Sequence, residues 1–243
     1  MNSSYTLGED NKKLPSECCP CCLFIWVHGI NNSLGEAMNG FTSVENSYNG
    51  WCYVVGFAWY SDPKTRAGFN TLDFGVKKQA ANQVATGAFT QFIKDFRTKC
   101  PDTRINLGGH SLGARVILKA LSAGLKVGTV LLAAAAVDNE SLKTEFSAAP
   151  ANAERIYNGY NPSDKVLQFA YTAWEWDTAL GEEGEETPVG GNVSSYKFTE
   201  WKTDHSGVYD QNVNRNYWDT FSSTTNGKCP AAESPANKGK QWK

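Results

Sequence analysis

A G-x-S-x-G pentapeptide at residues 109–113 constrains the fold of this chain more than any other feature. Residues 104–107 before it are typical of a short buried strand, and residues 114–121 after it carry apolar side chains at helical spacing. A strand that turns directly into a helix holds the central Ser111 in a strained backbone conformation with its hydroxyl exposed. Glycines on either side let the strand and the helix approach closely. The pattern therefore predicts a nucleophile elbow; the alternative is a Gly-rich turn with an incidental serine.

The histidine count narrows the choice of a general base. A serine hydroxyl is a poor nucleophile until a neighbouring imidazole accepts its proton. The chain has three histidines, of which His110 lies inside the elbow and faces away from the serine hydroxyl, and His28 ends an apolar run. By elimination we expect His205, in a polar loop after the strand-like residues 195–199, to be the base. The alternative is an ordinary surface histidine.

A catalytic triad also needs a carboxylate that orients the imidazole. Residues 155–160 predict a strand, and the turn that follows it ends in Asp164. Because parallel strands share one carboxyl edge, we expect Asp164 on the same rim as the elbow, in the chain order serine, acid, histidine. Asp138, which follows the apolar run 130–137, is the rival candidate. Asp164 is also a favoured residue for capping the next turn, which is the structural alternative.

Two backbone N–H groups are expected to form an oxyanion hole. One belongs to Leu112, directly after the serine, and the other to Ile30, in the loop after the apolar run 23–27. The residues expected to contact the substrate are His28, Gly29, Asn31 and His110.

Together these motifs resemble the α/β-hydrolase superfamily of the serine esterase and lipase type. The matching pieces follow the family's order, at residues 26–32, 57–61, 109–113, 161–164 and 204–206. The His-Gly-x-Asn-Asn loop at residues 28–32 is similar to that of a small, poorly characterised bacterial subgroup. The resemblance implies that the triad and the oxyanion donors named above hydrolyse a carboxylic ester through an acyl-enzyme intermediate.

Strand and helix patterns alternate along the chain. The expected strands lie at residues 23–27, 53–59, 104–107, 130–137, 155–160 and 195–199. A long amphipathic helix is expected over residues 74–98, with Val76 in its apolar stripe, and a short helix near residues 36–38. This alternation predicts an α/β fold with a mostly parallel sheet of about six strands and helices on both faces. We expect a minimal α/β-hydrolase fold without a large cap.

With 243 residues, the chain is expected to form one main domain. We predict an N-terminal Cys-containing segment at residues 1–22, a hydrolase domain at 23–223 and a flexible tail at 224–243. The acidic stretch 177–191 falls between the expected acid and base. It is either a solvated loop or a flap over the site.

Charge and hydropathy exclude some partners. The net charge is −2 and there is no basic run, so nucleic acid is not an expected partner. The longest apolar runs fall far short of the ~20 residues that span a bilayer, so no transmembrane segment is expected. The first seventeen residues lack an apolar leader, and the odd number of cysteines, seven, favours a reducing compartment. These features predict a cytoplasmic protein. The triad and the resemblance imply a small-molecule acyl ester as substrate, with no cofactor or metal required.

Four cysteines lie within five residues: Cys18, Cys19, Cys21 and Cys22. Structural zinc sites usually take their ligands from two separated pairs, so this spacing is unusual for zinc. The alternatives are reversible acylation, a thiol cluster without a ligand, or disulfides to Cys52, Cys100 or Cys229.

Other functions share the same residues. A thioesterase or a lipase or phospholipase would use the same triad, and the sequence does not separate them from an ester hydrolase. A non-catalytic binding module on this fold is the competing class. The intact set of serine, acid and histidine disfavours it, because a decayed site usually loses one member.

Overall fold

A six-stranded, all-parallel sheet in the order β2-β1-β3-β4-β5-β6 forms the centre of the protein. The computed structural model describes residues 19–30, 33–61, 72–201, 204–210 and 215–222, so Cys18 and Cys229, most of the predicted N-terminal segment and the predicted tail lie outside it. The strands are β1 (Cys22–Val27), β2 (Tyr53–Phe57), β3 (Arg104–His110), β4 (Val127–Ala133), β5 (Ala153–Tyr160) and β6 (Val193–Lys197). The predicted fold class is therefore confirmed.

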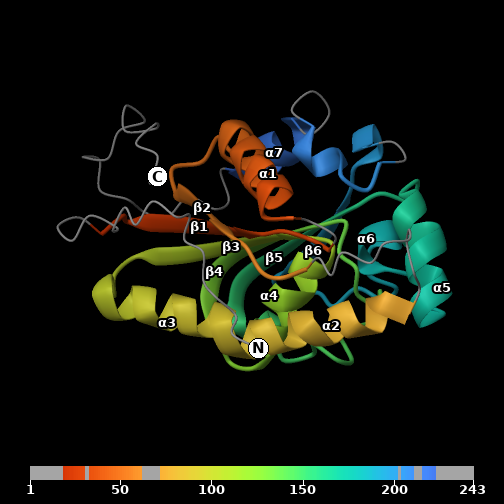
Figure 1. Cartoon of the computed structure of the whole chain (residues 1–243), viewed down its shortest axis with the longest axis horizontal. Coiled ribbons are helices and arrows are strands. Elements are labelled where there is room, and N and C mark those ends of the chain that lie inside the picture. The colour runs from red at the N-terminus through yellow and green to blue at the C-terminus, as the bar shows by residue number, and fades with distance from the viewer. Residues whose placement is uncertain (1–18, 31–32, 62–71, 202–203, 211–214, 223–243) are drawn as a thin grey trace.

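Helices cover both faces of the sheet (Figure 1). The α-helices are α1 (Leu34–Ser47), α2 (Leu72–Val84), α3 (Thr90–Lys99), α4 (Leu112–Ser122), α5 (Thr172–Glu175), α6 (Leu180–Glu183) and α7 (Arg215–Phe221). Two π-helical turns are η1 (Ala85–Phe89) and η3 (Val166–Tyr171), and the 3₁₀ turns are η2 (Pro150–Asn152), η4 (Thr199–Trp201) and η5 (Gly207–Tyr209). Helices α2, α3 and α4 lie on one face, and α1 and α7 lie on the other.

Two of the helices differ from their predicted form. The long helix over residues 74–98 is confirmed, but the turn η1 interrupts it between α2 and α3. The prediction that Val76 belongs to its buried stripe is wrong, because this side chain is 62% exposed. Helix α1 is much longer than predicted near residues 36–38, and Ser33 and Glu36 form a capping box at its start. That motif is visible in the sequence as a serine followed three residues later by a glutamate.

The central strands are buried on both faces. All six residues of β1 are buried, which explains why its sequence is continuously apolar and does not alternate. On the face that α1 and α7 cover, aromatic rings fill the space between helix and sheet. Phe24 stacks on Tyr48 with ring centroids 4.9 Å apart, and Trp26 packs against Trp218 at 5.5 Å. This aromatic layer fixes the distance between α7 and the sheet.

The strand order changes direction between β1 and β3. From β1 the chain goes outward to β2, then returns to place β3 on the other side of β1. Val27 pairs with Gly109, and His110 pairs with Ala133, so the carboxyl ends of β1, β3 and β4 are level. The carboxyl edge at such a switch point is where α/β proteins commonly bind their ligands.

A buried histidine fixes the loop that leaves β1. The Nδ1–H of His28 donates to the Gly29 carbonyl (2.8 Å), and its Nε2 accepts from the Trp59 N–H (3.1 Å). The Trp59 indole N–H donates in turn to the His28 carbonyl (2.8 Å). Burial lowers the pKa of His28 to about 4, so the ring is neutral near neutral pH and keeps one donor and one acceptor.

Disulfides hold the amino end of β1. Cys19 is bonded to Cys100, after α3, and Cys22 is bonded to Cys52, before β2. Cys21 is also disulfide-bonded, so these three cysteines are not available as zinc ligands. Disulfides persist in oxidising compartments and are rare in the cytosol. They weigh against a cytoplasmic localisation, which stays a prediction.

The acidic stretch 177–191 is packed against the sheet over its first part. Leu180 is buried, and its carbonyl accepts a hydrogen bond from Asn158 Nδ2 of β5 (2.9 Å). The Gly181 N–H donates to the Ala135 carbonyl (3.0 Å). Helix α6 is therefore part of the body of the protein. Within the described residues, no helix has both the length and the apolar character needed to cross a membrane.

We expect that loss of a disulfide lowers stability. The bond between Cys19 and Cys100 closes a segment with a sequence separation of 81, and the bond between Cys22 and Cys52 closes one of 30. Such bonds typically contribute about 2–5 kcal/mol, chiefly by restricting the unfolded chain. The double variants Cys19→Ala/Cys100→Ala and Cys22→Ala/Cys52→Ala should each melt lower than the unmodified protein by calorimetry. Equal melting temperatures, or free thiols at these positions in the native protein, would contradict the assignment.

We also expect acid to destabilise the fold through His28. Its folded pKa of about 4 lies below the ordinary 6.5, so the unfolded state binds the proton first as the pH falls. The stability that the neutral ring contributes is complete above pH 6.5 and is lost between pH 6.5 and 4, at a cost of about 3 kcal/mol by pH 4. Urea unfolding at pH 7, 6, 5 and 4 measures this loss. The variant His28→Asn should show a shallower dependence, and an equally steep one would refute the explanation.

Candidate active site

Ser111 sits at the turn from β3 into α4, with backbone angles φ 55° and ψ −125°. A positive φ is rare for a residue with a side chain and is strained, as expected at a nucleophile elbow. The Ser111 N–H donates to the Ala133 carbonyl (3.0 Å), and the Ser111 carbonyl accepts from the Ala136 N–H (3.3 Å). These two bonds to the end of β4 hold the strained turn in place.

The two glycines of the elbow are needed because of close backbone contacts. A Cβ on Gly109 would lie 2.8 Å from the Gly113 carbonyl group, and a Cβ on Gly113 would lie 2.2 Å from the Val27 carbonyl oxygen. A side chain at either position would push α4 away from β1 and β3. The loop after β1 is equally close, since a Cβ on Gly29 would lie 2.9 Å from the Ser111 Cβ. The site is therefore built from the adjoining ends of β1 and β3.

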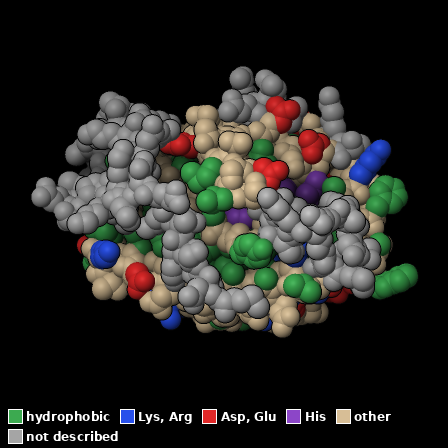
Figure 2. All heavy atoms as spheres, viewed as in Figure 1, with side chains coloured by type: hydrophobic (Ala, Val, Ile, Leu, Met, Phe, Trp, Pro, Cys, Tyr) green, Lys and Arg blue, Asp and Glu red, His purple; other side chains and the backbone are tan. Residues whose placement is uncertain are grey.

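His205 and Asp164, the residues predicted to be base and acid, lie in hydrogen-bond contact. The Nδ1 of His205 lies 2.7 Å from Asp164 Oδ2, and the Asp164 side chain is 1% exposed while that of His205 is 13% exposed. On the face that Figure 2 shows, histidine side chains are visible at the molecular surface. A buried carboxylate that accepts from Nδ1–H leaves Nε2 of the imidazole unprotonated and able to act as a base.

The second oxygen of Asp164 is held by the helical turn that follows it. Asp164 Oδ1 accepts hydrogen bonds from the N–H groups of Val166 (3.0 Å) and Leu167 (3.1 Å) at the start of η3. The cap that the sequence offered as the structural alternative is therefore present on one oxygen, while the other oxygen contacts His205; the role of Asp164 as the acid stays a prediction. The cap fixes the carboxylate and orients the oxygen that faces His205.

The rival acid, Asp138, is bound elsewhere. The Tyr171 hydroxyl donates to Asp138 Oδ1. Burial, with a further contribution from Asp138, raises the pKa of Tyr171, so this hydroxyl remains a donor. The hydrogen bonds of the described residues join Asp164, and not Asp138, to His205.

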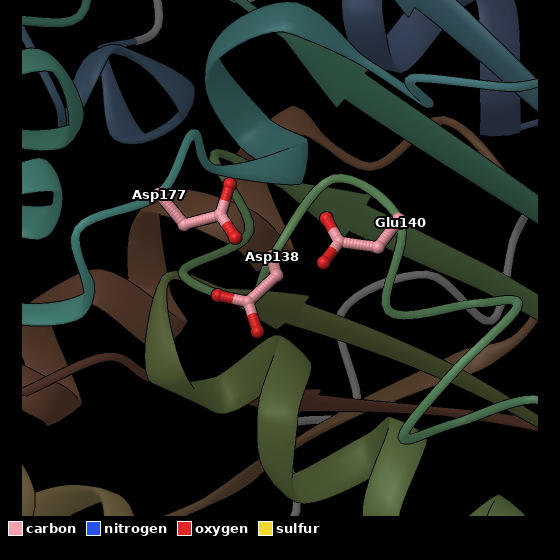
Figure 3. A group of neighbouring side chains, drawn as sticks. All are labelled: Asp138, Glu140 and Asp177. Atoms are coloured by element: carbon pink, nitrogen blue, oxygen red, sulfur yellow. The ribbon is translucent and has the colours of Figure 1, made fainter.

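Asp138 belongs to a cluster of three carboxylates with Glu140 and Asp177. One oxygen from each lies within 4.8 Å of the others, and Figure 3 shows Glu140 and Asp177 pointing toward each other from two segments, with Asp138 beside them. Oxygen ligands of this kind suit Ca²⁺ or Mg²⁺. Asp138 already accepts from Tyr171, and Asp177 accepts from the Thr178 N–H (2.7 Å). The cluster is distinct from the triad and carries no metal assignment.

The predicted oxyanion donors lie in the loop after β1 and at the start of α4. Leu112 begins α4, so its N–H has no acceptor within the helix, as an oxyanion donor requires. Ile30 follows Gly29 in the loop against Ser111 and is half-buried. Asn31 lies outside the described residues.

Two of the predicted substrate contacts have partners inside the protein. Both ring nitrogens of His28 are engaged by the backbone, as described above, which indicates a structural role. The Nε2 of His110 is 2.8 Å from the His205 carbonyl oxygen, so this ring lies against the loop of the base. Within the described residues, neither Ser111 Oγ nor His205 Nε2 makes a hydrogen bond, so the contact between nucleophile and base that the triad requires stays a prediction.

The sequence did not predict the side-chain contacts that hold α4 and the His205 loop in place. Arg115 is buried on α4, where its Nε donates to Asn82 Oδ1 of α2 (3.0 Å) and its guanidinium pairs with Glu145. Tyr209 accepts at its hydroxyl from the Trp26 indole N–H (3.1 Å), which ties the loop of the base to β1. The sequence carries no signal for these pairs, because their members are 30 to 183 residues apart.

A comparison with models of protein families identifies the same fold. A family model described as an alpha/beta hydrolase of unknown function, DUF900, matches residues 21–182, which include the elbow and Asp164. The search of curated proteins finds no match.

Among solved structures, the catalytic core domain of acetyl xylan esterase from Trichoderma reesei is 14% identical, covers 84% of this chain and 94% of its own, and has a TM-score of 0.42. An alpha-beta serine hydrolase homologue from Coxiella burnetii is 12% identical, with coverages of 81% and 85% and a TM-score of 0.47. The NocB thioesterase domain from the nocardicin cluster is 16% identical, with coverages of 82% and 91% and a TM-score of 0.43. Because the family model spans more than half of the chain, the protein belongs to the DUF900 family of alpha/beta hydrolases.

Proposed function

We propose that the protein is a serine hydrolase that cleaves a carboxylic ester through an acyl-enzyme intermediate, with Ser111 as nucleophile, His205 as general base and Asp164 as the orienting acid. The observation that carries the proposal is the 2.7 Å hydrogen bond between His205 Nδ1 and Asp164 Oδ2. His110, the residue directly before the strained Ser111, contacts the His205 carbonyl and so brings this pair to the elbow. A buried acid on one nitrogen of an imidazole and a strained serine nearby are the components of a Ser-His-Asp triad.

In the proposed reaction, His205 Nε2 accepts the hydroxyl proton as Ser111 Oγ attacks the ester carbonyl carbon. The N–H groups of Leu112 and Ile30 hold the negative oxygen of the tetrahedral intermediate. When the intermediate collapses, the bond from the acyl carbon to the alcohol oxygen breaks, and His205 gives its proton to the departing alcohol. Water then attacks the acyl-enzyme in the same way and releases the acid.

The substrate we propose is a small-molecule acyl ester. Thioesters and the acyl esters of lipids undergo the same two steps, so a thioesterase or a lipase or phospholipase is the alternative activity. A binding module without catalysis is the alternative class. Reaction of Ser111 with a fluorophosphonate distinguishes a hydrolase from a non-catalytic binding module, because only an activated serine reacts rapidly. Comparison of ester and thioester substrates of equal acyl length separates the activities.

We expect Ser111→Ala and His205→Ala each to lower kcat for short p-nitrophenyl esters by about 10³-fold or more, since each removes a group that the acyl-transfer step requires. A fluorophosphonate probe should label the unmodified protein and leave Ser111→Ala unlabelled. The measurements are steady-state kinetics and mass spectrometry of the labelled chain. Unchanged turnover in Ser111→Ala would exclude the serine mechanism.

We expect the two candidate acids to differ in their effect. Asp164→Asn keeps the shape of the side chain but removes the charge that orients and stabilises the imidazolium, and should lower kcat about 10²–10⁴-fold. Asp138→Asn is the matched control, because Asp138 bonds Tyr171 and should leave kcat near that of the unmodified protein. Kinetics of the two variants side by side decide the assignment. If Asp138→Asn were the slow variant, the role of the acid would pass to Asp138.

A further inference from the structure

The side chain of His110 contacts the backbone of the general base. Its Nε2 lies 2.8 Å from the His205 carbonyl oxygen, and the two imidazole rings have centroids 4.7 Å apart. Residue 110 is also the direct neighbour of Ser111 in the chain. One short chain of bonds therefore joins the backbone of the proposed nucleophile to the backbone of the proposed base, by way of the His110 side chain.

The chemistry of the contact fixes the state of the His110 ring. A carbonyl oxygen only accepts, so Nε2 carries the proton and donates it, while Nδ1 is unprotonated. The ring is buried, and that burial, with a smaller contribution from His205, lowers the pKa of His110 to about 3. A neutral ring presents the same donor throughout the pH range in which an imidazole base works.

His205 lies in the described segment 204–210, which is made of tight turns and the short η5, and Tyr209 is one of the anchors of this segment. The Tyr209 hydroxyl accepts from Trp26, and its ring lies 5.1 Å from the His110 ring. Tyr209 therefore fixes the far end of the loop to β1, and His110 fixes the base itself to β3.

We propose that His110 is a positioning residue, which sets where His205 stands relative to Ser111 by donating a hydrogen bond to the His205 carbonyl. The inference rests on the proposed function, because it assigns a role to His110 only through the base. Errors of about 1 Å in the placement of a reacting group can cost about 10²-fold in rate. The hydrogen bond from His110 to the His205 carbonyl positions the base and does not touch the substrate. Its loss should therefore lower kcat and leave KM nearly unchanged.

Two variants separate the hydrogen bond from the packing. His110→Phe keeps a planar ring but has no donor, and we expect kcat to fall about 10–100-fold with KM within about twofold. His110→Gln offers an amide N–H donor in place of Nε2–H, and we expect it to recover most of that loss. The rate of fluorophosphonate labelling at Ser111 should fall and recover in parallel. Ile93→Ala is the control for lost stability, because Ile93 is a buried residue of α3. This variant should lower the melting temperature without lowering kcat at 25 °C.

The outcomes separate this inference from the proposed function. Labelling and turnover of the unmodified protein that depend on Ser111, together with an unchanged kcat in His110→Phe, would overturn the positioning role alone. Equal losses in His110→Phe and His110→Gln would also overturn it, because they would show that shape and not the donor matters. An unmodified protein that the probe does not label, or that Ser111→Ala does not impair, would overturn the proposed function and this inference with it.

Discussion

The close approach of α4 to the ends of β1 and β3 is the constraint on which the rest of the site depends. Gly113 lies so near the Val27 carbonyl that a Cβ would be 2.2 Å from its oxygen, and the chain can enter the helix there only through the positive φ of Ser111. Packing at the switch point of the sheet thus forces the strain at the serine. The strain in turn places the hydroxyl at the carboxyl edge, where the loops after β1, β4 and β5 meet.

Further hydrogen bonds fix the turn at Ser111 and the positions of Asp164 and His205. Backbone bonds from Ser111 to Ala133 and Ala136 tie the elbow to the end of β4. The cap on Asp164 orients the acid from β5, and the acid orients His205. Each element thereby fixes the group that the next one needs. All of these bonds lie within the protein itself, so the fold alone can hold Asp164 and His205 in one orientation, which preorganised catalysis would require.

Features of the fold that depend on local sequence patterns could be predicted from the sequence. Buried parallel strands appear as apolar runs, and the G-x-S-x-G turn reports a backbone constraint that only glycine meets, so the six strands and the elbow were predictable. The sequence was a poor guide to contacts between distant residues. The buried Arg115 with Glu145 and the support of the His205 loop by Tyr209 join segments that no local pattern relates. Disulfides to Cys52 and Cys100 were among the alternatives that the sequence offered, but the pairing of the individual cysteines was not predictable. The burial of Val76 was predicted wrongly for a similar reason, because the neighbouring elements decide which side of a helix is buried.

The three histidines show how environment divides one residue type into different roles. His28 has both ring nitrogens bonded to backbone groups and a lowered pKa, which suits a fixed structural ring at the end of β1. His110 is buried with one nitrogen on the His205 backbone, and it is equally neutral. His205 differs because its side chain is 13% exposed and its Nδ1 lies 2.7 Å from an oxygen of the buried Asp164 carboxylate. The ring nitrogens of His28 and the Nε2 of His110 contact backbone groups instead. This difference in burial and partner supports the proposal that His205, and neither of the other two, acts as the base.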